Sequence, residues 1–319
     1  MSQPTERILI GVSSCLLGEE VRFDGGHKRN SFVSDTLAEF FDFQPYCPEM
    51  AIGLGIPRPT IRLIERDGRT HLVDSRDDSI DHTTAMASTA REYCASLPSD
   101  ISGYIVKSRS PSCGMERVNL FNDKGMPTKT GIGIFTAELL RMHPQLPVEE
   151  EGRLNDARLR ENFIERVFVF HRWTRLLKAG INAAALMDFH RVHKFIIQAH
   201  DEATGRELGQ LVAGVSADNC EHTAQTYFTS LMKALSRPAS RGSHINVLQH
   251  IMGFLKKDLS TDDKQELLDL FDAFHRGQSP LVVPLTLINH HLRKHPKPYI
   301  NDQLYLHPYP AELMLRNHV

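Results

Sequence analysis

The first half of the chain alternates short apolar runs with polar breaks rich in glycine and proline. Short apolar runs bounded by turn residues are typical of buried strands, and apolar residues at helical spacing separate several of them. The predicted strands are residues 6–12, 41–44 and 101–107, with a hairpin over 60–65 and 70–74. The predicted helices are residues 31–41, 83–96 and 130–142. Such alternation predicts an α/β domain with an open, mainly parallel sheet and flanking helices.

Beyond a proline-bounded break at residues 143–147, strand-like alternation gives way to helical periodicity. The consecutive glutamates 149–151 are predicted to begin a solvent-exposed helix, and Ser260 or Thr261 to cap a later one. The predicted helices are residues 153–178, 187–200, 217–235, 244–258, 261–275 and 281–294. The sequence therefore predicts two domains, an α/β domain over residues 1–147 and an all-α domain over residues 148–319.

Composition limits the class of protein without naming a function. The 319 residues are 41% hydrophobic with a formal net charge of −2, an ordinary balance for a soluble protein. The polar start of the chain resembles no signal segment, and no run reaches the about 18 apolar residues of a membrane span. We therefore expect a cytoplasmic protein without membrane contact, and nothing in the pattern indicates an obligate protein partner. Five cysteines, widely spaced, argue against a disulfide framework.

Three of the cysteines share one position relative to the predicted strands. Cys15, Cys47 and Cys113 each follow the end of a strand, whereas Cys94 lies on the apolar side of a predicted helix and is expected in the core. In an open α/β sheet, the carboxyl ends of the strands form the edge where ligands bind. Their wide separation excludes a local Cys-x-x-Cys zinc site, so a shared site has to be assembled by the fold.

Three thiolates are one fewer than the four that usually hold an iron–sulfur cluster. A cluster held by three would leave one iron open, and an open iron is a Lewis acid with affinity for sulfur. This pattern favours chemistry on a sulfur atom. Other interpretations remain open: three separately buried thiols, a zinc-dependent hydrolase on the same cysteines, or a cluster that senses oxygen or iron in an RNA-binding regulatory protein without turnover.

Polar residues next to these cysteines are candidates for catalysis and substrate binding. Glu49, two residues after Cys47, is a candidate general acid/base, and Ser110 is placed to hydrogen-bond a substrate or a water molecule. Asp24 belongs to a polar, glycine-bearing loop that could border the substrate. Candidate donors beside the cysteines are Ser13, Ser14 and Ser112. Each of these serines could instead satisfy a turn.

Three motifs together resemble the thiouracil desulfidase family, over roughly residues 5–145. They are Ser13-Ser14-Cys15-Leu16-Leu17-Gly18 followed by Arg22-Phe23-Asp24-Gly25, then Cys47-Pro48-Glu49, then Ser110-Pro111-Ser112-Cys113-Gly114. The resemblance implies an α/β domain that binds a 4Fe–4S cluster through Cys15, Cys47 and Cys113, with the fourth iron taking the sulfur of the substrate. It implies an acid/base role for Glu49 and a catalytic role for Ser110. The products would be the oxo-base and sulfide.

The second half resembles, more loosely, a helical domain of unknown function often fused to that family, through residues 168–173 and 299–310. Fused pairs are implied to remove sulfur from 4-thiouridine, as a nucleoside or within tRNA. Two local basic runs, residues 166–200 and 273–301, would then contact RNA, although a charge count alone favours an ordinary solvated helix face. The candidate RNA-binding residues are Arg172, Arg175, Arg293 and Lys294. Nearby aromatic residues, Phe170, Trp173 and Tyr299, could stack on bases or belong to the core.

Overall fold

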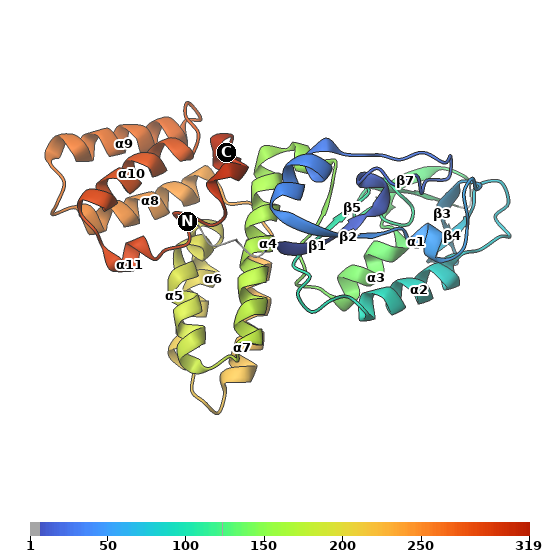
Figure 1. The fold of residues 1–319 in the computed structure, drawn as a ribbon, viewed down its shortest axis with the longest axis horizontal. Coiled ribbons are helices and arrows are strands. Elements are labelled where there is room, and N and C mark those ends of the chain that lie inside the picture. Colours follow the sequence, from blue (N-terminus) through green and yellow to red (C-terminus); the bar gives the residue numbers. More distant parts are fainter. Residues whose placement is uncertain (1–6, 123) are drawn as a thin grey trace. The chain divides into compact units, whose positions relative to one another are not determined.

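The computed structural model describes residues 7–122 and 124–319 and divides the chain into two compact units between Asn155 and Asp156 (Figure 1). The first unit contains all the strands of the described chain, and the second is helical. This architecture confirms the predicted α/β domain followed by an all-α domain.

The first unit is built on a four-stranded parallel sheet in the order β2-β1-β5-β8. Its strands are β1 (Ile8–Ser13), β2 (Phe41–Tyr46), β5 (Tyr104–Val106) and β8 (Val148–Glu150). The apolar run of β1 lies in the middle of the sheet, and Ile10 and Val12 are fully buried. A central parallel strand is covered on both faces, which is why its sequence is almost continuously apolar.

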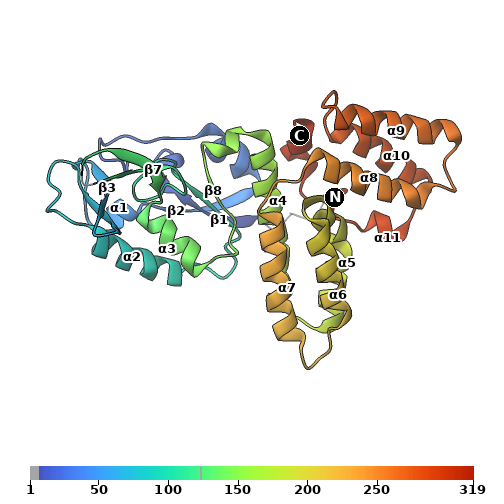
Figure 2. The same ribbon diagram turned by 180° about the vertical axis from the view of Figure 1, so that it is seen from behind.

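Helices α2 (Thr83–Ala95) and α3 (Ile134–Met142) lie side by side against one face of this sheet (Figures 1 and 2). The Phe135 ring of α3 packs 5.6 Å from the Tyr104 ring of β5. Cys94 on α2 is fully buried, as its place on the apolar side of the helix predicted.

A second, mixed sheet has the order β4-β3-β6-β7. Its strands are β3 (Ile61–Arg66), β4 (Arg69–Asp74), β6 (Val118–Phe121) and β7 (Pro127–Gly131). The antiparallel pairing of β3 with β4 confirms the predicted hairpin, whose turn places Asp67 and Gly68 at positive φ. Strands β6 and β7 were not predicted, because they are short and β7 is mostly exposed, so no apolar alternation marks it.

The continuous helix predicted over residues 31–41 is wrong. Only short helical turns form, at Phe32–Thr36 and Leu37–Glu39, and β2 already begins at Phe41. Val33, Leu37 and Phe41 have helical spacing and are all fully buried. Phe41, however, is buried as the first residue of strand β2. The buried residues of this segment therefore have the spacing of a helix although no continuous helix forms.

The glutamates 149–151 also differ from the prediction. They neither begin a helix nor face solvent: β8 pairs with β5, and the three residues are only 5%, 6% and 8% exposed. The carboxylates of Glu150 and Glu151 are satisfied by partners far away in the sequence, and that of Glu149 pairs with Arg153, four residues on. Such pairing is what allows charged groups to be buried. The first unit therefore continues to Asn155 and includes eight residues beyond the predicted boundary after residue 147 (155 − 147).

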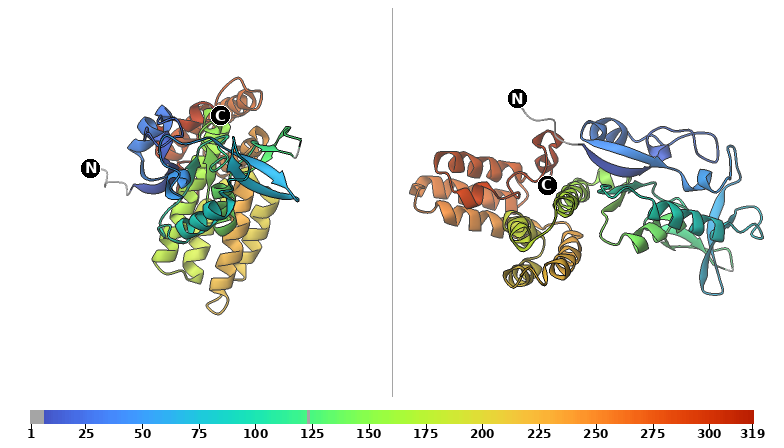
Figure 3. Two further views of the ribbon diagram at one scale, coloured as in Figure 1. Left: turned by 90° about the vertical axis from the view of Figure 1, so that its right-hand side faces the viewer. Right: turned by 60° about the horizontal axis from the view of Figure 1, so that its bottom comes forward.

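The second unit is a packed set of helices (Figure 3). They are α4 (Ala157–Lys178), α5 (Ala183–His200), α6 (Glu202–Ala213), α7 (Cys220–Leu235), α8 (Arg241–Leu255), α9 (Thr261–His275), α10 (Val282–Lys294) and α11 (Pro298–Asn301). Ser260 caps α9 in a reciprocal capping box with Asp263, which confirms that predicted start. Helix α6, capped by Asp201, was not predicted. None of the described helices is long and apolar enough to cross a membrane.

Candidate active site

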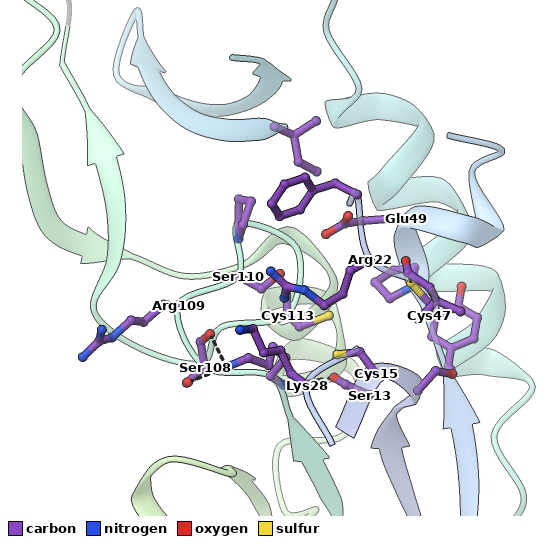
Figure 4. Close-up of a pocket in the computed structure, with 18 of the residues that line it drawn as sticks. Ser13, Cys15, Arg22, Lys28, Cys47, Glu49, Ser108, Arg109, Ser110 and Cys113 are labelled. Carbon is purple, nitrogen blue, oxygen red and sulfur yellow. Dashed lines mark hydrogen bonds between the residues drawn. The ribbon is translucent and has the colours of Figure 1, made fainter. Parts of the chain in front are cut away.

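A cavity of about 320 Å³ lies where β1, β2 and β5 end, and Cys15, Cys47 and Cys113 line it (Figure 4). Cys15 lies in a tight turn directly after β1, and Cys113 in the loop that follows β5. Cys47 follows β2 and caps the short helix α1 (Pro48–Ala51). Figure 4 shows the three sulfur atoms turned toward the same space. The parallel sheet thus brings together thiols that are remote along the chain.

Burial controls the ionisation of these thiols. It raises the pKa of Cys15 to about 11, with the Cys47 charge as the next cause. Burial also raises the pKa of Cys47. It raises the pKa of Cys113 well above its ordinary value, and the charges of Glu49, Cys47 and Cys15 raise that pKa further. Bound metal ions ionise cysteine ligands by releasing their protons. The site therefore favours neutral thiols until a cation of high charge compensates them.

The spacing of the donors bears on the kind of metal they could hold. Within residues 7–122 and 124–319, no group of three or more His, Cys, Asp or Glu side chains is placed to bind a single metal ion. One zinc ion needs its ligands at tetrahedral distance around one centre, whereas a cubane cluster gives each thiolate its own iron. Cys15 and Cys113, which are buried, and the half-buried Cys47 lie around one cavity and fit the cluster better, which counts against the zinc hydrolase considered from the sequence.

Glu49 is held at the cavity by two partners. Its Oε2 accepts hydrogen bonds from Arg58 Nη2 at 2.6 Å and Nε at 3.1 Å, and its Oε1 accepts one from Ser112 Oγ at 2.9 Å. Arg58 is itself buried and donates to the carbonyls of Val21 and Gly55. Sequence reasoning missed Arg58 because it lies in a glycine- and proline-rich loop. The signal that could have found it is an arginine between two prolines just after the Cys-Pro-Glu motif.

Ser110 lines the cavity and organises the loop that carries Cys113. Its Oγ accepts hydrogen bonds from the backbone N–H groups of Ser112 at 3.2 Å and Cys113 at 3.1 Å. A hydroxyl that accepts in this way still has its own proton to donate. Ser110 can therefore donate a hydrogen bond into the cavity.

The predicted substrate-binding residues divide into two groups. Ser13 and Ser14 are buried and line the cavity, and Ser13 Oγ accepts a hydrogen bond from the Lys107 N–H at 3.0 Å. Ser112 is fully buried and contacts Glu49, so it orients that carboxylate instead of lining the cavity. Asp24 lies outside the cavity lining, and its exposed carboxylate accepts from the Gly26 N–H within its own loop; its contact with substrate stays a prediction. Asp-x-Gly turns use the carboxylate in this local way.

Basic side chains gather on the cavity lining and were not identified from the sequence. Arg22 follows the Cys15 turn, Lys28 belongs to the same loop, and Arg109 adopts a positive φ of 60° directly before Ser110. Lys107 also lines the cavity but forms an ion pair with Glu151. Arg22 lies 3.7 Å from the Asp24 carboxylate, and Glu49 is already paired with Arg58. Lys28 and Arg109 therefore give this lining a positive charge that favours an anionic ligand.

The buried glutamates of β8 and its continuation hold the loop that carries Ser110 and Cys113. Glu151 accepts from the Ser108 N–H at 2.6 Å and from the Ser108 hydroxyl at 2.8 Å, besides its ion pair with Lys107. Glu150 accepts from the N–H groups of Met115 at 2.8 Å and Glu116 at 3.3 Å. Both ends of this loop are thus tied to one edge strand, and the sequence pattern gave no sign of it.

The candidate RNA-binding residues lie on two helices of the second unit. Arg172 on α4 is half-buried, burial lowers its pKa to about 10, and its guanidinium donates to the Pro308 carbonyl. Arg175 on α4 and Arg293 and Lys294 on α10 are exposed. Trp173 is 4% exposed and belongs to the apolar core, so it is not available to stack on a base. Arg172 is therefore a structural contact, which corrects its use as a freely exposed cation.

Two family models match the chain. One, described as 2-thiouracil desulfurase, matches residues 10–151, and the other, a protein of unknown function called DUF1722, matches residues 194–310. A solved structure described as "[4Fe-4S]-dependent thiouracil desulfidase TudS (DUF523Vcz)" is 34% identical in sequence and covers 47% of this chain and 95% of its own, with a TM-score of 0.37.

Two curated relatives are each similar to about half of this chain. The uncharacterized protein YbgA of Escherichia coli (strain K12) is 30% identical over 165 residues, which is 51% of this chain and 98% of YbgA. The uncharacterized protein YbbK of Bacillus subtilis (strain 168) is 29% identical over 156 residues, which is 46% of this chain and 99% of YbbK. The chain thus belongs to the 2-thiouracil desulfurase family through its first unit and carries a DUF1722 domain in its second.

Proposed function

We propose that the first unit removes the sulfur of a thiolated uracil and releases sulfide, using a 4Fe–4S cluster held by Cys15, Cys47 and Cys113. The observation that carries the proposal is the convergence of three cysteine thiols on one cavity that Glu49 and Ser110 also line. Membership of the 2-thiouracil desulfurase family supports the reaction. The relative with 34% sequence identity is described as [4Fe-4S]-dependent, which supports the cofactor.

When bound, such a cluster supplies one iron without a protein ligand, a Lewis acid with affinity for sulfur. The side chains around it have separate tasks. Glu49 takes a proton of the attacking water as the water oxygen bonds to the thiolated ring carbon. The C–S bond then breaks and the two water protons leave with the sulfide, so thiocarbonyl and water give carbonyl and hydrogen sulfide. Arg58 and Ser112 fix the orientation of its carboxylate at 2.6 and 2.9 Å. Ser110 donates a hydrogen bond that orients the water or the base. The reaction exchanges sulfur for oxygen without net redox change.

We propose 4-thiouridine, as a nucleoside or within tRNA, as the substrate. Of the two forms, the basic lining favours the one within tRNA, because only a substrate that carries phosphate offers a counter-charge to the basic side chains Lys28 and Arg109. The helical unit would then provide further contacts to RNA through exposed basic side chains.

The test of the proposed reaction is anaerobic reconstitution of the full chain with iron and sulfide. About four irons per chain are expected, with the broad visible absorption of an iron–sulfur protein, and the reconstituted protein should release sulfide from 4-thiouridine. A zinc content of about one per chain with no iron uptake would contradict the proposal. So would a fully loaded cluster that leaves 4-thiouridine and its nucleotide unchanged.

For RNA contact by the helical unit, we expect the combined change Arg175→Glu, Arg293→Glu and Lys294→Glu to weaken tRNA binding and to flatten its salt dependence. Each lost phosphate contact should lower the slope of log K against log salt by about 0.7 to 0.9. Arg172 is left out because its replacement would disturb the fold. The measurement is a binding titration at several salt concentrations, with exposed Lys233→Glu as the matched control. Unchanged affinity and slope would place the RNA contacts elsewhere.

A further inference from the structure

The helical unit contains a second cavity, of about 440 Å³, that the proposed desulfidation does not use. Its polar lining comes from the start of α4, with Arg158 and Glu161, and from the start of α8, with Ser240, Arg241 and His244. All these residues belong to the second unit.

The two arginines on this cavity have no acidic partner in the part of the chain that the structure describes. Arg158 Nη2 donates only a 3.3 Å hydrogen bond to the Ala239 carbonyl. The guanidinium of Arg241 lies over the Phe274 ring, 5.8 Å from its centroid. Both residues are exposed, so their charges are available to a ligand that enters from solvent.

Glu161, the one acidic side chain among the described residues of the cavity wall, is already compensated. Glu161 accepts from the Tyr309 hydroxyl at 2.9 Å and lies 3.5 Å from Arg316 Nε. The neighbouring carboxylate Glu165 lies 2.7 Å from His200 Nε2 and 3.6 Å from Arg316 Nη2. The buried acids are thus matched by buried bases. The acidic and basic side chains of the lining therefore leave an uncompensated positive charge, that of Arg158 and Arg241.

Neutral hydrogen-bond donors at the cavity also favour an anionic ligand. Ser240 Oγ accepts from the Ser243 N–H and caps α8, a helix of 15 residues, while the N–H groups of Arg241 and Gly242 have no backbone or side-chain acceptor among the described residues. His244 is 7% exposed, and burial lowers its pKa to about 3, so the ring is neutral. Its Nδ1 lies 2.9 Å from the Tyr305 hydroxyl. If this nitrogen accepts from tyrosine, the ring proton is on Nε2, where it is a further donor.

We propose that this cavity binds a phosphate group through Arg158, Arg241 and His244. Two guanidinium groups supply charge-assisted hydrogen bonds, and the start of a helix supplies free N–H donors with the positive end of the dipole. The phosphate could be a diester of an RNA backbone or belong to a small phosphorylated molecule, since the donors recognise the shared group. The inference does not depend on the proposed desulfidation.

The experiment measures binding of inorganic phosphate to the full chain by calorimetry, with chloride used to keep the ionic strength constant. Saturable binding is expected for the unchanged protein, and Arg158→Gln and Arg241→Gln should each weaken it about tenfold. Arg206→Gln is the matched control, because Arg206 is an exposed arginine on α6 paired with Glu202. Both test positions are exposed, so circular dichroism should show a preserved fold.

A second arm identifies the source of the phosphate. If RNA is the source, inorganic phosphate should compete with tRNA, and each variant should lower the salt slope of tRNA binding by about 0.7 to 0.9. If a small molecule is the source, the variants should weaken phosphate binding and leave tRNA binding unchanged; both results support the site. Absence of saturable phosphate binding, or equal affinity in Arg158→Gln, Arg241→Gln and the control, would overturn it. Neither arm requires iron or sulfide release, so failure of the desulfidase proposal would be seen separately.

Discussion

Replacing Cys113 with alanine is expected to abolish iron binding and sulfide release, whereas the same change at Cys94 should leave both intact. The two cysteines are a matched pair, since both are buried and unpaired within the first unit. Only Cys113 lines the cavity, while Cys94 packs on α2 away from it. Sulfide release by Cys113→Ala should fall about 10³-fold or more, toward the uncatalysed rate.

The measurement is iron per folded chain after anaerobic reconstitution, followed by sulfide release from 4-thiouridine. Cys15→Ala and Cys47→Ala should behave like Cys113→Ala. Because either change leaves a small void in a packed interior, unfolding midpoints of Cys113→Ala and Cys94→Ala are compared first. If Cys113→Ala kept full iron and turnover, the three-cysteine site would be wrong.

The second large effect is expected for Glu49→Gln, which should keep the iron but lose about 10² to 10⁴-fold in turnover. Glutamine preserves the shape of the side chain and an acceptor for Ser112, yet it cannot take a proton from water. The substitution separates the desulfidase from a cluster-based sensor, because a sensor has no need of a proton acceptor at this position. The measurement is kcat at fixed cluster content, with Glu138→Gln on α3 as the control for the loss of an ion-paired glutamate.

Glu49→Gln also leaves the buried guanidinium of Arg58 without its counter-ion, and an uncompensated buried charge can cost several kcal/mol. The double variant Glu49→Gln/Arg58→Gln removes both charges and addresses this concern. It should recover stability relative to Glu49→Gln without recovering turnover. Wild-type turnover in either variant would remove Glu49 from the mechanism.

The sequence predicted those parts of the fold and of the site that depend on local pattern. The apolar run of β1 followed by Cys15 is visible without a structure, because a buried parallel strand and the turn after it leave a local signature. The same holds for α9, whose start is marked by Ser260 and Asp263. The rules that relate strand ends to ligand sites then bring the three cysteines to one edge.

What the sequence could not show is the burial of polar residues by distant partners. Arg58 looks like a loop residue until its contact with Glu49 is seen, and Glu151 looks like solvent-exposed charge until it meets Lys107 and Ser108. In the same way, Arg172 looks like a surface cation although its guanidinium is engaged by the Pro308 carbonyl. The sequence gives the charge of a side chain but does not identify the residue that pairs with it in the fold.

Strand β8 sets a limit on how the first unit can be separated from the rest of the chain. A fragment ending at residue 147 would lack this strand, leaving the hydrogen-bonding edge of β5 open and releasing the segment that bears Ser110 from Glu150 and Glu151. The shortest autonomous catalytic piece therefore ends near Asn155. Natural variation in the segment that joins the two units is therefore expected after that point.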